Sequence, residues 1–197
     1  YGYEFLGAGA AALSALSSGR GDFAKALKDA ERPMMIVGQG ALTGADGADV
    51  LGLARRVAES RGIVDVKAGW NGFNVLHTAA ARVGGLDLGF VPGDGGLDRD
   101  GILDAAGSGK LKVVYLLAAD EIDMARLGKA FVIYQGHHGD AGANRADVIL
   151  PGAAYTEKNA TYVNTEGRPQ MARLAVQTPG DAREDWTIIR ALSDTLG

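Results

Sequence analysis

The fold is decided by three short apolar runs in the second half of the chain. They are Lys112-Val-Val-Tyr-Leu-Leu-Ala118, Ala130-Phe-Val-Ile-Tyr-Gln135 and Asp147-Val-Ile-Leu150, the last closed by Pro151. Continuous runs of this length, rich in β-branched and aromatic residues, are typical of strands buried on both faces of a parallel sheet. Because helical segments separate them, we expect right-handed βαβ crossovers and an α/β fold with a doubly wound, mostly parallel, Rossmann-like sheet.

The same alternation extends toward the N-terminus. A short strand over 34–37 precedes Gly38-Gln39-Gly40, and helical spacing of apolar residues follows over 46–60, with Gly62 as its stop. Further on, the pattern predicts a strand over 63–66, a helix over 71–83, a short strand over 88–91, a helix over 98–106 and a short helix over 122–127.

The two ends of the chain differ from this rhythm. Residues 1–32 are expected to form a helical lead-in, with one amphipathic helix over 22–30, and residues 33–197 to form the α/β domain. After Pro151, extended pieces over 161–164 and 169–176 are joined by a turn at Glu166-Gly167, which predicts an irregular β arm. A final helix is expected to begin near Asp181.

Composition excludes several classes of function. The 197 residues contain no cysteine, so the chain forms no disulfide and cannot ligate an iron–sulfur cluster through thiolates. A net charge of −4 without long charged runs argues against nucleic acid as a partner. The apolar runs fall far short of the roughly 20 residues of a membrane helix. Because the sequence begins at Tyr1, we expect a fragment of a longer protein.

Two glycine-containing loops resemble phosphate-binding motifs but depart from them. Gly38-Gln39-Gly40 follows a strand, as a dinucleotide loop does, yet Thr43 stands where the fingerprint needs Gly or Ala. Gly107-Ser-Gly-Lys110 lacks the remaining residues of a P-loop and precedes a strand instead of a helix. A plain strand-to-helix turn and a helix C-cap are the better interpretations.

Polar residues at the predicted strand ends are the other site candidates. His137-His138, just after the strand that ends at Gln135, suggests a metal or acid–base site, but neighbouring side chains of extended backbone point to opposite faces, so polar loop contacts are favoured. Asp120 lies where ligands bind in open α/β sheets, but acids also cap helices there. No G-x-S-x-G elbow occurs. We therefore expect no catalytic residue and no metal ligand.

Residues 134–168 carry a distinctive pattern. They begin Tyr134-Gln-Gly-His-His-Gly, continue through Asp147-Val-Ile-Leu-Pro151, and end Asn164-Thr-Glu-Gly-Arg168. This stretch resembles the C-terminal region of the large, 75 kDa type iron–sulfur subunit of respiratory complex I, the proton-pumping NADH:quinone oxidoreductase. Further matches are Asn74-Val-Leu-His77, Leu86-Asp-Leu-Gly89 and Ala182-Arg-Glu-Asp-Trp-Thr-Ile-Ile-Arg-Ala-Leu192.

The resemblance implies a molybdopterin-oxidoreductase-like domain that has kept its scaffold and lost the molybdenum cofactor. It implies a non-catalytic, structural role, with no cofactor in these residues and iron–sulfur clusters in the N-terminal part of the parent. It also implies, as partners, the rest of the subunit and other peripheral-arm subunits, without membrane insertion. The location would be the cytoplasmic side of a bacterial inner membrane, or the matrix side in mitochondria.

Two alternatives remain open at this point. The domain retains a molybdopterin or nucleotide site, for which the vestigial candidates are Gly38, Gln39, Gly40, Asp120, Gln135, His137 and Arg168. In that case Arg168 would recognise a pterin or phosphate by bidentate hydrogen bonds. Alternatively, the domain is a regulatory module that senses a metabolite.

Overall fold

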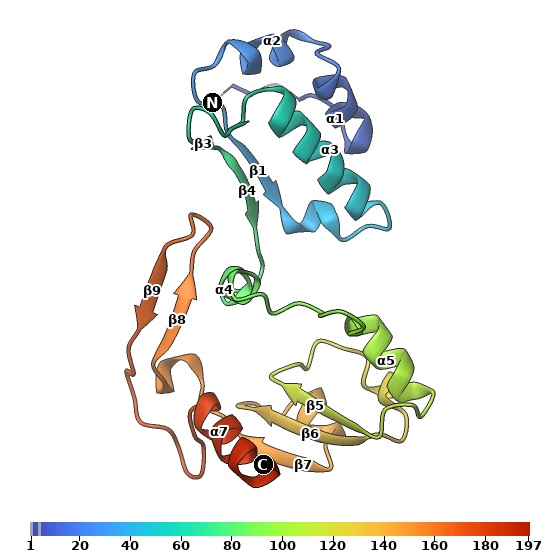
Figure 1. Cartoon of the computed structure of the whole chain (residues 1–197), viewed down its shortest axis with the longest axis vertical. Helices are drawn as coiled ribbons and strands as arrows, with labels where there is room; N and C mark the ends of the chain where they lie inside the picture. The colour runs from blue at the N-terminus through green and yellow to red at the C-terminus, as the bar shows by residue number, and fades with distance from the viewer. Residues whose placement is uncertain (1, 4) are drawn as a thin grey trace. The chain divides into compact units, whose positions relative to one another are not determined.

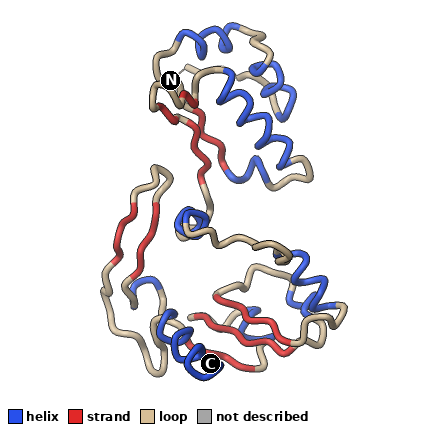
Figure 2. The backbone as a smooth tube through the Cα atoms, in the orientation of Figure 1, coloured by secondary structure: helices blue, strands red, loops and turns tan. Residues whose placement is uncertain are grey.

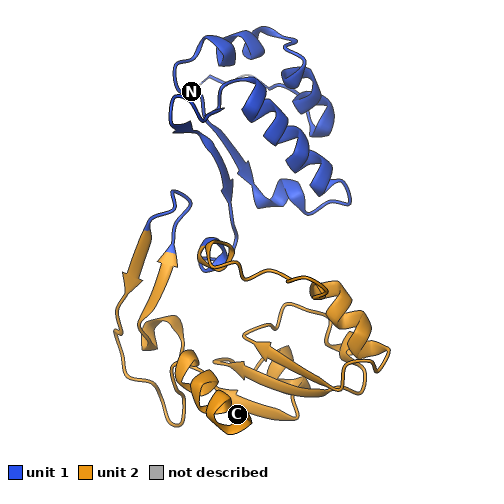
Figure 3. Cartoon of the chain, viewed as in Figure 1, with its two compact units in different colours: residues 1–83, 163–168 blue, residues 84–162, 169–197 orange. Residues whose placement is uncertain are grey.

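A computed structural model describes residues 2–3 and 5–197. The chain divides into two compact units (Figure 3). The first unit comprises the residues up to 83 together with 163–168, and the second unit comprises 84–162 and 169–197. Each unit has its own parallel strands, so the α/β class with mostly parallel pairing is confirmed. The parallel strands lie in two separate sheets instead of one.

The first unit packs helices against a two-stranded parallel sheet (Figure 1). Strand β1 pairs with β4 so that Val37 lies beside Val75. The core between the helices and the sheet contains Leu16, Ala24, Val57, Ala58 and Ile63. Its elements are α1 (Gly9–Ser17), α2 (Asp22–Asp29), β1 (Met35–Gly38), the 3-10 helix η1 (Gln39–Leu42), α3 (Gly47–Ser60), β2 (Val64–Asp65), β3 (Trp70–Asn71) and β4 (Phe73–Leu76).

One sequence prediction in this region is wrong, and two are incomplete. Residues 71–83 do not form one helix: β4 occupies Phe73–Leu76, and α4 spans only Arg82–Asp87. The β4 backbone pairs with β1, and Phe73 packs against the core, so tertiary pairing overrides the helical spacing. The lead-in also contains α1, in addition to the one predicted helix. Strand 63–66 shortens to β2, which pairs antiparallel with β3.

The second unit is built on the three runs that decided the fold. Strands β5 (Val113–Leu117), β6 (Phe131–Gly136) and β7 (Val148–Pro151) form a parallel sheet in the order β5-β6-β7 (Figure 2). Helix α5 (Arg99–Gly107), the 3-10 helix η2 (Met124–Leu127) and helix α6 (Ala141–Arg145) connect to these strands. The core of this unit contains Leu103, Ala106, Val114, Leu116, Leu127, Ala130, Val132 and Tyr134.

The C-terminal elements also follow the prediction. A 3-10 helix η3 (Tyr155–Glu157) leads into the hairpin of β8 (Ala160–Val163) and β9 (Pro169–Ala172), which is the expected β arm. The final helix α7 is present as predicted but spans Asp185–Leu196, so it begins four residues after the expected start near Asp181. The predicted strand over 88–91 is wrong: these residues form a turn and loop, with Leu88 and Phe90 almost fully exposed. None of the helices in the described part of the chain has the length and apolar character that a membrane crossing requires.

Candidate functional site at the carboxyl ends of the strands

The second unit has a cavity at the carboxyl ends of β6 and β7. Its volume is about 560 Å³, within the range of small-molecule sites. Open parallel sheets bind ligands at this edge, so the position agrees with a ligand site. The cavity is lined by Gly136, His137, His138, Gly139, Ala143, Ile149, Pro151, Gly152, Ala154, Glu157, Pro179, Asp181 and Ala182.

The two histidines at this cavity contact each other. Their ring centroids are 4.4 Å apart in an edge-to-face arrangement, and both side chains are exposed. Across residues 2–3 and 5–197, no three His, Cys, Asp or Glu side chains are grouped so as to hold a metal ion. His77 follows strand β4 in the first unit, so its predicted place in a helix is wrong.

A cluster of two carboxyls and a tyrosine joins the loops that follow β5 and β6. Hydrogen bonding to the Asp140 carboxyl raises the pKa of Asp120, and the same bond lowers the pKa of Asp140. The Tyr134 hydroxyl donates to Asp140 Oδ2 over 3.5 Å. Burial, and secondarily the negative charge of Asp140, raises the pKa of Tyr134 to about 12. Asp120 is therefore the carboxyl of the pair that keeps its proton to higher pH.

Gln135 is fully buried and its polar atoms are satisfied inside the protein. The Tyr115 hydroxyl donates to Gln135 Oε1. Gln135 Nε2 donates to Asp185 Oδ1 over 2.9 Å, and Lys158 forms an ion pair with the other oxygen of that carboxylate. This Tyr115–Gln135–Asp185–Lys158 network ties β5, β6 and the start of α7 together. It does not line the cavity, so Gln135 is a structural residue.

The Gly38-Gln39-Gly40 segment lies in the first unit, where β1 passes into η1. Gln39 Oε1 accepts hydrogen bonds from the Thr78 backbone N–H (2.9 Å) and hydroxyl (3.0 Å), which fixes the residues after β1 to those after β4. Neither Gly38 nor Gly40 has other atoms near the position of a Cβ. The glycine that this turn requires is Gly47, where a Cβ would lie 2.1 Å from the Leu42 carbonyl oxygen.

Arg168 lies at the tip of the β8–β9 hairpin with its side chain exposed. Asn164 Oδ1 accepts hydrogen bonds from the backbone N–H groups of Glu166 and Arg168, each over 3.0 Å. An asparagine side chain that bonds the following backbone in this way stabilises a tight turn. Within the described residues, the Arg168 guanidinium forms no ion pair with Glu166, so a turn contact accounts for this position.

Of the predicted candidates, the structure thus brings His137 and its neighbour His138 into the cavity. Asp120 and Gln135 belong to the same unit but do not line it. Glu157 and Asp181 also line it, and of these two sequence reasoning missed Asp181. It also missed Tyr115 and Asp185 as partners of Gln135, and Lys158 as the partner of Asp185, because 50 residues separate Gln135 from Asp185 and no local pattern signals the contact.

Comparison with protein families identifies the family of the chain. The family model described as molybdopterin oxidoreductase matches residues 1–195. The chain belongs to the molybdopterin oxidoreductase family. This confirms the family resemblance that residues 134–168 predicted.

Curated relatives within this family share nearly half of their aligned residues with the chain. The chain is 46% identical over 196 residues to the NADH-ubiquinone oxidoreductase 75 kDa subunit of Reclinomonas americana, covering 100% of this chain and 28% of that protein. It is 45% identical over 196 residues to the mitochondrial NADH-ubiquinone oxidoreductase 78 kDa subunit of Neurospora crassa, covering 99% and 25%. It is 44% identical over 198 residues to the mitochondrial NADH dehydrogenase (ubiquinone) iron-sulfur protein 1 of Solanum tuberosum, covering 100% and 25%. The chain spans about a quarter of the length of these relatives.

The family name implies a molybdopterin cofactor, whose phosphate groups are anionic. Proteins recognise such groups with Arg or Lys side chains, or with the N-termini of helices. The described residues that line the cavity include the acids Glu157 and Asp181 and no Lys or Arg. Gln135 and Gln39, two of the residues predicted for such a site, hydrogen-bond within the protein. This donor set does not fit an anionic pterin.

Proposed function

We propose that the chain is a non-catalytic structural domain of the iron–sulfur subunit of a proton-pumping NADH:quinone oxidoreductase, respiratory complex I. The relatives named above support the assignment to this subunit. The observation that carries the structural role is the inward use of polar groups at the strand ends. Gln135 directs its hydrogen bonds to Tyr115 and Asp185, so the position most suited to a ligand holds the fold together.

The proposal includes no cofactor in these residues. The iron–sulfur clusters belong to the part of the subunit outside this chain, because the chain has no cysteine to ligate them. The partners are the remainder of the same subunit and the other peripheral-arm subunits. The domain lies on the cytoplasmic side of a bacterial inner membrane, or on the matrix side in a mitochondrion.

A matched pair of variants in the full-length subunit tests this role. Leu127 is fully buried in the core of the second unit, whereas His137 lines the cavity and is exposed. Leu127→Asp buries an unpaired charge, so we expect loss of the assembled complex. His137→Ala should leave both assembly and the rate of NADH-driven quinone reduction unchanged. Normal assembly and rate after deletion of residues 33–197 would contradict the structural role.

The competing function is a retained molybdopterin site. Elemental analysis of the purified full-length subunit for molybdenum and tungsten, from a host that makes the cofactor, separates the two. We expect neither metal above background. Stoichiometric molybdenum that is lost in His137→Ala but kept in an unrelated surface variant would establish the competing function instead.

A further inference from the structure

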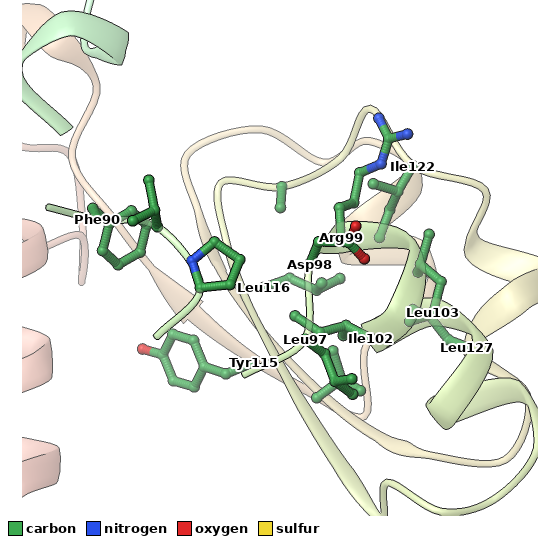
Figure 4. Close-up of a pocket in the computed structure, with 14 residues that line it drawn as sticks. Phe90, Leu97, Asp98, Arg99, Ile102, Leu103, Tyr115, Leu116, Ile122 and Leu127 are labelled. Carbon is green, nitrogen blue, oxygen red and sulfur yellow. The ribbon is translucent and has the colours of Figure 1, made fainter. Parts of the chain in front are cut away.

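The second unit has an open apolar groove of about 580 Å³ beside strand β5 (Figure 4). Three segments form its walls: the 90–92 loop, the start of α5 with residues that precede it, and β5 with η2. Four lining residues belong to the core and are at most 6% exposed, namely Leu103, Val114, Leu116 and Leu127. The groove therefore lies directly against the buried hydrophobic core of the second unit.

Strand β5 borders this groove with a free edge. Within the described residues it pairs only with β6. The Phe131 N–H donates to the Lys112 carbonyl, and the Ala118 N–H donates to the Gln135 carbonyl. In a parallel ladder alternate residues bond the same neighbour, so the even-numbered residues of β5 bond β6. The backbone groups of Val113, Tyr115 and Leu117 consequently point away from the sheet.

The groove is bordered by apolar side chains that are otherwise exposed. Phe90 is 86% exposed, Val91 57%, Leu97 47% and Ile102 36%. Single exposed apolar residues are ordinary, but a contiguous group beside an unpaired strand edge marks an interaction surface. Asp98 and Arg99 are the charged residues of the lining: Asp98 caps α5, and Arg99 forms an ion pair with Asp100. The occupant must therefore be largely apolar.

We infer that an extended strand of the same subunit, with alternating apolar side chains, docks in this groove and pairs with the free edge of β5. This inference rests on the proposed function, in which the domain is part of a longer subunit. A strand is the occupant because it satisfies the outward backbone groups of β5 while its side chains fill the groove. It comes from the same subunit because the exposed apolar surface to be covered adjoins the domain's own core.

The length of the relatives supports this source. At least 72% of the Reclinomonas americana subunit lies outside the part that this chain matches, since the chain covers 28% of it. A strand within the same polypeptide is held near the groove at high effective concentration, whereas a separate subunit must first diffuse to it.

Amide hydrogen exchange in the free, full-length, monomeric subunit tests the inference. The amides of Val113, Tyr115 and Leu117 should exchange at least roughly a hundredfold more slowly than exposed amides. Fast exchange in the free subunit overturns the inference, whether or not exchange slows when the complex assembles. Slow exchange only in a dimer, detected by light scattering, also overturns it, because a second copy is then the occupant.

Two isoleucines provide a matched pair of variants. Ile102 lines the groove and is 36% exposed, whereas Ile189 on α7 lies outside the groove and is 44% exposed. Ile102→Asp should speed exchange at Tyr115 at least tenfold, and Ile189→Asp should leave it unchanged. Equal effects of the two variants contradict the inference. Because exchange in the unmodified subunit is the primary measurement, the test holds even if Ile102→Asp fails to fold. Slow exchange at β5 in the unmodified subunit, together with normal assembly of the complex when residues 33–197 are deleted, would refute the structural role but not the docked strand.

Discussion

Replacing Gln135 with Leu tests whether this buried amide holds the second unit together. The change keeps the volume but removes the acceptor of the Tyr115 hydroxyl and the donor to the Asp185 carboxylate. A hydrogen bond to a charged group contributes about 1.5–3 kcal/mol and a neutral one about 0.5–1.5 kcal/mol. We expect the free energy of unfolding of the second unit to fall by about 2–4 kcal/mol.

Urea unfolding followed by fluorescence measures this loss. Trp186 lies in the first turn of α7, next to Asp185, and Trp70→Phe removes the signal of the first unit. The control is Gln170→Leu, an exposed position where we expect less than about 0.5 kcal/mol. A loss below about 1 kcal/mol in Gln135→Leu would refute the reasoning, because the amide would then not be structurally engaged.

Three further changes test other contacts. Gly142→Ala places a Cβ 2.5 Å from the Tyr134 ring, so a loss of about 1–3 kcal/mol is expected in urea unfolding, while Gly139→Ala, with open space, should be neutral. The pKa of Tyr134 is near 10 in the unfolded chain and about 12 in the folded protein, so the contribution of its neutral hydroxyl to folding stability is complete below pH 10 and is lost between pH 10 and 12. Over that interval the free energy of unfolding of the wild type should fall by about 2–3 kcal/mol more than that of Tyr134→Phe, as measured by denaturant unfolding at a series of pH values. Arg61 donates to the last carbonyls of α1 over 3.0 and 2.7 Å, so Arg61→Met should destabilise the first unit by about 1–2 kcal/mol in thermal melts, against less than about 0.5 kcal/mol for Arg55→Met at an exposed ion pair.

The sequence predicts what local composition controls. Strands β5, β6 and β7 lie within one or two residues of their predicted bounds. A short apolar, β-branched run flanked by polar residues favours a buried strand over other local structures. The helix predicted over 71–83 failed because residues 73–76 pair with β1, about 38 residues earlier in the chain. Local spacing carries no information on such a pairing.

The candidate site shows the same limit. Topology directed attention to the carboxyl ends of the strands, and the structure has a cavity there that His137 lines. Gln135 precedes His137 by two residues, but its side chain is buried in the interior, where its amide donates a hydrogen bond to Asp185. Whether a polar residue at a strand end faces a ligand or the interior depends on a helix 50 residues away, which the sequence does not reveal.

Two features of the second unit support the proposed structural role: one lies at the strand ends and the other along the β5 edge. At the strand ends, the Gln135 amide is bonded within the protein, and the cavity carries the acids Glu157 and Asp181. Along the β5 edge, exposed apolar side chains border a groove, and within the described residues the outward backbone groups of β5 pair with no strand. A ligand-binding domain would keep a residue such as Gln135 free for its ligand. A domain that bonds Gln135 internally and leaves an apolar groove beside an unpaired strand edge is suited to holding another part of its own subunit.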